Sequence, residues 1–218
     1  MRYQFDWTAV LNPSAWIAAL GVTVSYAVGT IVGGMIIGVV CGQMLLSSRW
    51  WIRGPVGAYV QVFRCTPLLV QIVWFYYALP ILTGISVPAW LAAGLGLTLY
   101  MGAFCSEIFR GGVISIDKGQ WNAARALGMS YLQMMRYIIL PQAARRMVPP
   151  FVNQSVLQLK NTSLLYVVAV PDLMYTSYEI TARTYRPLEV YTAVAGIYFL
   201  ILYPLTVMSK RLEARAGE

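Results

Sequence analysis

The sequence predicts an all-α protein that crosses a membrane about five times. Hydrophobic residues make up 59% of its 218 residues and charged residues only 11%, whereas a typical soluble domain carries about 25% charged residues. So few charges cannot cover the surface of a protein in water. A helix needs about 20 mostly apolar residues to cross a bilayer. We expect one transmembrane domain over 1–218, with spans at 15–46, 67–84, 87–106, 148–170 and 190–208.

The first span contains no charged residue, and only Arg2 precedes it. It is too long for the apolar core of a signal peptide, so we interpret it as retained. Gly34, Gly38 and Gly42 repeat along it at a spacing of four, and glycines at that spacing let two membrane helices approach closely. We expect this face to pack against another helix; a substrate path along it is the alternative.

The second span begins at Thr66 and Pro67, which are typical of a helix start because threonine caps the first turn and proline is preset for it. A helix N-terminus inside a membrane protein can hold an anion such as a substrate carboxylate. Gln71, on the next turn, could add a hydrogen bond. An ordinary helix cap at the membrane surface is the alternative. The third span follows after a short uncharged connection.

Lysine and arginine residues predict the orientation, because cytoplasmic loops are enriched in them. Segments 47–66 and 107–147 and the tail after Ser209 hold twelve of these residues, whereas the connections on the other side hold three. This places the N-terminus outside and the C-terminus in the cytoplasm, as an odd number of spans requires. The net charge of +8 therefore reflects membrane orientation and does not predict nucleic acid binding.

The long cytoplasmic loop is expected to contain two short helices. The first covers 121–127 and is followed by Gly128, at a position where glycine commonly ends a helix. Ser130 would cap the second, over 131–140, which Pro141 would interrupt. Small alanines on the first helix offer a flat surface that a partner protein could seat in a groove. A helix lying on the bilayer is the alternative.

The fourth span is the most polar. At 3.6 residues per turn, its five polar side chains fit one face within an arc of about 160°: Asn153, Gln154, Gln158, Lys160 and Asn161. Polar groups in a span are costly and point to a cavity or a partner, so this stripe is the candidate substrate path. Interhelical hydrogen bonding is the alternative. Thr162 and Ser163 are expected to interrupt the helix and expose backbone groups.

Lys160 is the most specific single candidate for a substrate contact in the fourth span. It could pair with a substrate carboxylate, lock a gate by pairing with Glu107, or extend to the lipid headgroups. Glu107 is also spaced i, i+3 from Arg110, which favours a structural ion pair between those two. The external segment 171–189 carries charges of both signs; it is either a dock for a binding protein or a solvated loop.

The sequence also excludes classes of chemistry. Without histidine, the chain has no Ser–His or Cys–His nucleophile and no histidine-containing zinc site. Cys41, Cys65 and Cys105 are too far apart in sequence for a zinc motif. No P-loop motif occurs, so any ATP would be bound by another polypeptide. We expect no catalytic residue, no metal and no cofactor in this chain.

The cytoplasmic loop resembles a known motif. Asn122-Ala123-Ala124, then Gly128 and Ile138-Ile139-Leu140-Pro141, resemble the EAA loop of ABC importer permeases: E-A-A, three residues, G, nine residues and I-x-L-P. Asn122 replaces the glutamate of that motif, which puts one charged contact to the ATPase in doubt. Four more segments resemble polar amino acid permeases of the histidine, glutamine, arginine and glutamate type. They are Phe63–Gln71 (F-R-G-T-P-L-L-V-Q, with Cys65 for glycine), Ser106–Gly112 (S-E-I-x-R-G), Lys118–Gln120 (K-G-Q) and Leu159–Leu164 (L-K-[DN]-[ST]-S-L).

This resemblance implies the fold of a type I ABC importer permease and ATP-driven uptake of a polar amino acid, with glutamate and aspartate among the candidates. Two permease subunits, this chain twice or this chain and a paralogue, would enclose the path in a bacterial inner membrane. Two ATPase subunits would bind ATP and Mg²⁺, and an external binding protein would deliver the amino acid. A self-sufficient channel or secondary carrier, acting as a homodimer, is the alternative.

The resemblance also implies roles for residues. The coupling contact to the ATPase would be made by Asn122, Ala123, Ala124, Arg125, Ala126, Leu127 and Gly128. The candidate substrate path comes from the helix start, the polar stripe and the ion-pair options above, and the resemblance favours part of it; its residues are Thr66, Pro67, Gln71, Glu107, Asn153, Gln154, Gln158, Lys160, Asn161, Thr162 and Ser163.

Overall fold

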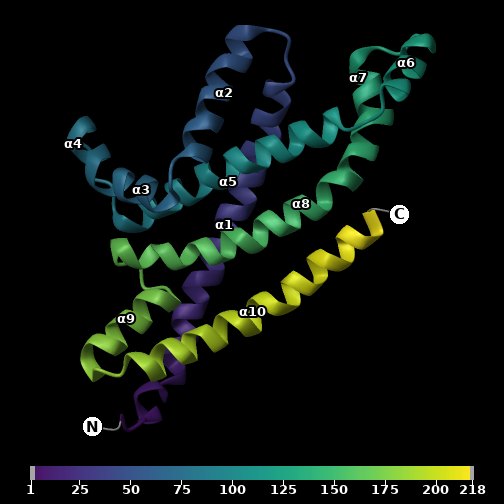
Figure 1. Ribbon diagram of the computed structural model, residues 1–218. Helices are drawn as coiled ribbons and strands as arrows, with labels where there is room; N and C mark the ends of the chain where they lie inside the picture. Colours follow the sequence, from purple (N-terminus) through teal and green to yellow (C-terminus); the bar gives the residue numbers. More distant parts are fainter. Residues whose placement is uncertain (1–2, 217–218) are drawn as a thin grey trace.

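The computed structural model describes residues 3–216, which are helical almost throughout and contain no strand. Figure 1 shows the N-terminal segment and α9 at one end of the molecule and α6 and α7 at the other. The elements in chain order are η1 (Trp7–Val10), α1 (Pro13–Leu45), α2 (Trp50–Cys65), α3 (Leu68–Val73), η2 (Trp74–Ala78), α4 (Leu79–Thr83), α5 (Ala89–Ile114), α6 (Lys118–Ala126), α7 (Tyr131–Met134), η3 (Met135–Ile139), α8 (Leu140–Asn161), η4 (Thr162–Val168), α9 (Leu173–Thr184) and α10 (Pro187–Ala216).

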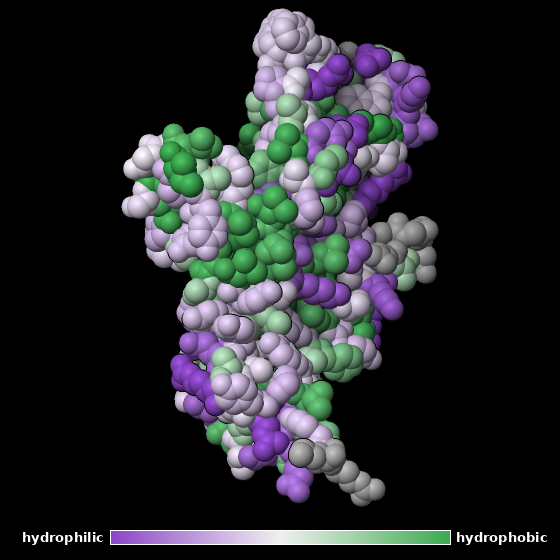
Figure 2. Space-filling view, turned by 60° about the vertical axis from the view of Figure 1, so that its left-hand side comes forward, coloured by the Kyte–Doolittle hydropathy of each residue, from purple (hydrophilic) through white to green (hydrophobic). Residues whose placement is uncertain are grey.

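Three helices within the described residues, α1, α5 and α10, are long and apolar enough to cross a membrane. A fourth crossing is formed if α2 and the bent helix that follows it count as one span. The sequence predicted five spans. The one predicted over 148–170 falls on α8, whose two arginines, internal prolines and polar side chains make it less apolar than the other spans. The crossing at α8 stays a prediction. Figure 2 shows a broad apolar region across the middle of one face, with hydrophilic residues toward both ends.

The core of the bundle is the contact between α1 and α5. A Cβ atom placed on Gly42 would lie 2.8 Å from the Cβ of Phe109, and one placed on Gly38 would overlap Cys105. Gly34 faces Met101 in the same way. The predicted packing role of this glycine face is therefore confirmed. The opposite side of α1 exposes large aliphatic side chains, among them Val28, Val32 and Ile36.

The cytoplasmic connection predicted over 47–66 is wrong, because α2 occupies most of it and packs against α1 and α5. Arg53 and Arg64 suggested a loop, but both project from an exposed side of this helix. The next helix, predicted over 67–84, covers 68–83 in three pieces, with a π-helical turn at η2. It is bent by 109° from α2.

The predicted cytoplasmic loop is largely helical. The helix α5 extends to Ile114, so Glu107 and Arg110 belong to it and not to a loop. The predicted break at Pro141 is wrong, because α7, η3 and α8 run on without interruption. Proline lacks an N–H group and its ring crowds the preceding turn. The π-helical turn of η3, which directly precedes α8, widens the helix there and accommodates the ring.

At the opposite end, the external segment 171–189 contains the helix α9, which the sequence did not predict. The Glu189 side chain, at the start of α10, is fully buried. Its carboxylate accepts hydrogen bonds from the Tyr3 hydroxyl (2.5 Å) and the Asp6 N–H (2.8 Å). These bonds fix the N-terminal segment to α10.

Candidate functional site

The helix α6 stands at the far end of the molecule (Figure 1) and has one packed and one free face. Asp117 caps it by accepting the Gly119 N–H at 2.6 Å. Ala124 is fully buried, and the ring of Trp121 stacks on Tyr131 with centroids 6.4 Å apart. The free face exposes most of the predicted coupling residues: Asn122, Ala123, Arg125, Ala126, Leu127 and Gly128.

The turn after α6 is built as the sequence predicted. Gly128 has φ +72°, the left-handed conformation in which glycine carries no penalty. Ser130 forms a full capping box with Gln133, satisfying two N–H groups at the start of α7. Both ends of α6 are therefore capped by local hydrogen bonds.

A single apolar cluster connects this end of the molecule to α5 and α8. It contains Phe109 and Val113 of α5, Met135 and Ile139 of η3, and Ala143 of α8, and Trp121 of α6 packs against it. Buried apolar side chains transmit displacement because protein interiors are close-packed. A force applied to α6 therefore reaches both α5 and α8.

At the bend between α2 and α3, the predicted residues Thr66, Pro67 and Gln71 come together. Gln71 is 7% exposed; its Nε2 donates to Phe63 O (2.9 Å), Thr66 O (3.0 Å) and Thr66 Oγ1 (2.8 Å). Thr66 does not cap α3, as its hydroxyl donates back to Val62 O. Its predicted cap role is wrong because the bend puts it at the end of α2.

An open cavity of about 340 Å³ lies at this bend, lined by Val62, Phe63, Thr66, Val70, Gln71, Trp74 and Phe75. The Gln71 Oε1 atom is buried and has no hydrogen-bond partner among the described residues. A buried carbonyl without a partner is costly. The cavity therefore presents an apolar surface, and the buried Gln71 oxygen is not accessible from it in this conformation.

The predicted polar stripe of α8 is divided by the packing. Gln158 is fully buried, and its Nε2 donates to Thr30 Oγ1 (3.1 Å) and Leu97 O (2.9 Å). Gln158 therefore joins α8 to α1 and α5. Its prediction as a path residue is corrected: the alternative, interhelical hydrogen bonding, is what the structure shows. Gln154 is buried on the same side, whereas Asn153 is exposed.

Lys160 is exposed beside a second open cavity of about 270 Å³, lined by Lys160, Ser163, Met174, Tyr198 and Leu202. Asn161 is half-buried and Thr162 is fully buried, with its hydroxyl donating to Leu159 O. The α-helix changes to a 3-10 helix at Thr162, as the sequence predicted.

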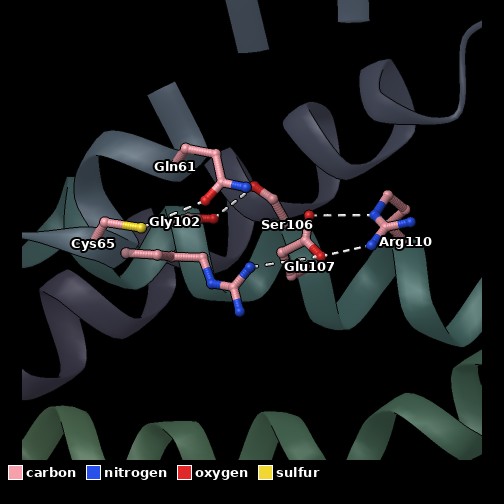
Figure 3. A network of polar contacts seen from close by, with 7 residues as sticks. Gln61, Cys65, Gly102, Ser106, Glu107 and Arg110 are labelled. Atoms are coloured by element: carbon pink, nitrogen blue, oxygen red, sulfur yellow. Dashed lines mark hydrogen bonds and ion pairs between the residues drawn. The ribbon is translucent and has the colours of Figure 1, made fainter. Parts of the chain in front are cut away.

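Glu107 of α5 forms an ion-pair network with two arginines (Figure 3). Its carboxylate accepts from Arg110 Nη2 (2.7 Å) and Nε (3.2 Å), and Arg64 Nη1 lies 3.7 Å away. The predicted pair with Arg110 is confirmed. The predicted gate with Lys160 is absent: among the side chains that the structure describes, Glu107 pairs with arginines alone and Lys160 forms no ion pair.

Sequence reasoning missed Asp172, which precedes α9. Its side chain is fully buried; Oδ1 accepts the Tyr175 N–H at 2.8 Å, and Oδ2 has no partner within the described residues. Burial raises the pKa of this carboxyl to about 6, because a low dielectric disfavours the charged form. Aspartate is a common helix N-cap, so Asp172 after Pro171 could have indicated the start of α9. No sequence signal indicated that the Asp172 side chain is buried.

Comparison with known proteins places these features in a family. Residues 34–218 match the family described as binding-protein-dependent transport system inner membrane component. The chain belongs to this family. It is 35% identical to the glutamine transport system permease protein of Escherichia coli K12, over 97% of this chain and 98% of that protein. It is 34% identical to the histidine/lysine/arginine/ornithine transport system permease protein of Salmonella typhimurium, over 97% and 94%.

A solved structure agrees with this assignment. The chain matches the crystal structure of an amino acid ABC transporter with histidines, at a TM-score of 0.91 and 30% identity over 98% of this chain and 100% of that one. A methionine ABC transporter matches at a TM-score of 0.77 and 20% identity, which shows the fold alone. The chain is therefore the permease component of an amino acid ABC importer with a type I permease fold, and permeases of this kind are not themselves catalytic.

Proposed function

We propose that this chain and a second permease subunit form the membrane path of an importer for a polar amino acid. An external binding protein delivers the amino acid, and two cytoplasmic ATPase subunits bind ATP and Mg²⁺. The observation that carries the proposal is α6: an exposed helix, capped at both ends, whose Trp121 packs on an apolar cluster shared by α5, η3 and α8. A channel or carrier that works alone has no use for such a contact.

In this proposal the ATPase subunits move α6 when they close on ATP. The apolar cluster under α6 carries the movement to α5 and α8. Packed helix interfaces switch between discrete arrangements and do not deform continuously. The permease therefore alternates between an outward-facing and an inward-facing state, and ATP hydrolysis resets it.

The proposed orientation has the N-terminus outside and α6 in the cytoplasm of a bacterial inner membrane. The tied N-terminal segment, α9 and the start of α10 then form the outer surface. A rigid outer surface of this kind suits docking of the binding protein. In this arrangement, the cationic residues around α6 follow the positive-inside rule.

For the substrate, we propose an amino acid whose carboxylate contacts Lys160. The sequence from Lys118 to Pro171 contains no Asp or Glu, so no carboxylate of that stretch competes for this ammonium. The positive charge favours an acidic side chain such as that of glutamate or aspartate.

Uptake by the reconstituted importer tests this proposal. Lys160→Met should raise the KM for the transported amino acid by about tenfold or more, since a charged hydrogen bond is worth roughly 1.5–3 kcal/mol. Lys160→Arg, which keeps the charge, should retain most of the affinity. ATP hydrolysis without substrate should be unchanged in both. An unaltered KM in Lys160→Met would remove Lys160 from the substrate path.

A further inference from the structure

Three charged side chains lie beside the bend that follows α2. The helix α2 and the helix after it are together long and apolar enough for one span, bent by 109°. Arg64 is the last residue but one of α2, and it lies next to Glu107 and Arg110 of α5. At 1.5 Å per residue, Arg64 lies about 21 Å along α2 from Trp50, and Glu107 lies about 10 Å from the nearer end of α5. The three charges therefore lie within the length of two membrane-crossing segments.

The surroundings of these charges follow from their depth. Charged side chains inside a membrane face other protein or a water-filled cavity, because lipid does not solvate them. The side chains of Arg64 and Arg110 are 37% and 38% exposed, and that of Glu107 is 26% exposed. This face of α2 and α5 is thus open in the single chain. It therefore points to a second protein or to water, and a water-filled substrate path meets this requirement.

Glu107 neutralises one arginine and leaves the other nearly free. Arg110 donates two hydrogen bonds to the carboxylate, at 2.7 Å and 3.2 Å (Figure 3). Arg64 Nη1 comes only to 3.7 Å from Oε2, which is too long for a hydrogen bond. Glu107 is the only acidic residue between Asp6 and Asp117, so the helices from α1 to α5 hold no second carboxylate for Arg64. The group keeps a net charge of +1.

An aromatic ring positions the free guanidinium. The Arg64 Cζ atom lies over the ring of Phe104, 5.5 Å from its centroid, a distance at which a cation is attracted to the face of the ring. The N–H donors of a guanidinium lie in its plane, in a fork that matches a carboxylate. Contact through the face of the guanidinium leaves the donors at its edge available. Arg64 is therefore a preoriented receptor for an anion.

We propose that Arg64 binds a carboxylate of the transported amino acid, at a site between the end of α2 and α5. This inference rests on the proposed function, and it adds a substrate contact on helices other than the one that carries Lys160. Glu107 competes with the substrate for Arg64, so the carboxylate can leave again. Every amino acid carries an α-carboxylate, so this site recognises the class of substrate and not one side chain.

The test measures amino acid binding to the complex of permease and ATPase in nanodiscs, without the external binding protein. The probes are radiolabelled glutamate, glutamine, histidine and arginine. For the probe that binds most tightly, Arg64→Gln should weaken binding about tenfold or more, since a charge-assisted hydrogen bond is lost. Arg64→Lys should restore part of the affinity, because it keeps the charge without the fork. Arg53→Gln, exposed on the same helix, is the matched control and should bind as the wild type does.

A second variant separates substrate binding from structural support. Glu107→Gln removes the competing carboxylate and raises the local charge from +1 to +2. Amino acid binding should then tighten severalfold, because the attraction for an anion grows with the charge. A pair that only holds α2 against α5 predicts the opposite. Loss of either member would then lower the Tm and weaken binding.

Four results would overturn the inference. The first is unchanged binding in Arg64→Gln. The second is weaker binding with a lower Tm in both Arg64→Gln and Glu107→Gln, which would leave only a structural contact. The third is unchanged amino acid binding with less co-purified phosphatidylglycerol in Arg64→Gln, which would assign Arg64 to a lipid headgroup. The fourth is a wild-type complex that takes up an amino acid but binds none of the four probes.

Uptake by the wild type separates this inference from the proposed function. ATP-dependent uptake into liposomes, together with any of the four results, leaves the proposed function intact and removes only the role of Arg64. No ATP-dependent uptake of any of the four amino acids, with the binding protein present, would overturn the proposed function and the inference with it.

Discussion

At the scale of single residues, burial determines what Asp172 can do. One of its oxygens caps α9, and the other has no partner in the described part of the chain. None of the cationic side chains that the structure describes forms an ion pair with it. The Tyr198 hydroxyl of α10 is also buried without a partner among the described residues. The pKa of this carboxyl is therefore raised, and the protonated form suits its site.

Asp172 predicts a pH dependence of stability. The folded protein holds this proton up to about pH 6, whereas the unfolded chain releases it near 3.8. Between these values the folded state binds more protons, so the free energy of unfolding falls as pH rises, by roughly 3 kcal/mol for this group. Asp172→Asn keeps the cap and removes the charge. Thermal unfolding in detergent should then show a flatter profile between pH 4 and pH 6, and a higher Tm at pH 7. An unchanged profile would mean that the carboxyl is solvated.

At the scale of elements, the α1–α5 contact depends on the absence of side chains. Gly34, Gly38 and Gly42 place the backbone of α1 directly on Met101, Cys105 and Phe109. Close backbone approach strengthens dispersion contacts, which drive helix association where lipid removes the hydrophobic contribution. These glycines therefore hold α1 and α5 together along the most extensive helix contact in the described residues.

Substitution of one glycine tests this contact. Gly38→Ala places a Cβ atom against Cys105, and overpacking of this kind costs about 1–3 kcal/mol. We expect a lower Tm in detergent and a lower yield of folded protein. Gly29→Ala is the matched control on the same helix, since nothing lies within 4 Å of its added Cβ atom. It should be neutral or stabilising. Equal losses in the two variants would contradict the account.

Features that depend on neighbouring residues could be predicted from the sequence, whereas contacts between distant helices could not. The Gly128 turn, the Ser130 cap and the Glu107–Arg110 pair each depend on residues within four positions of one another, so the sequence predicts them. Arg64 joins Glu107 from another helix, and Gln158 bonds to α1 and α5. Neither contact follows from spacing. The helix α2 was missed because arginines near its ends resemble a loop.

At the scale of the whole molecule, the two ends differ in charge and in construction. One end carries α6 with the exposed cations Lys118 and Arg125. The other carries the N-terminal segment, tied to α10 through Glu189, and the helix α9. The proposed importer assigns these ends to the cytoplasm and to the outside. The amino acid then passes between α8 of this chain and a second permease subunit.

Labelling of single cysteines tests this orientation. In a background with Cys41, Cys65 and Cys105 replaced by alanine, Leu127→Cys and Phe5→Cys each place a thiol at an exposed site, 77% and 62% exposed. A membrane-impermeant maleimide applied to spheroplasts should label Phe5→Cys only. Inverted membrane vesicles should label Leu127→Cys only. The reverse pattern would contradict the proposed orientation.

The central claim is that transport by this chain is driven by ATP on a separate subunit. The tagged chain is purified from native membranes in mild detergent with the proteins it retains, and is then reconstituted into liposomes. We expect a co-purified P-loop ATPase and amino acid uptake only when ATP is present on the side of that ATPase. A chain that purifies alone and moves an amino acid without ATP would contradict the account and favour a secondary carrier.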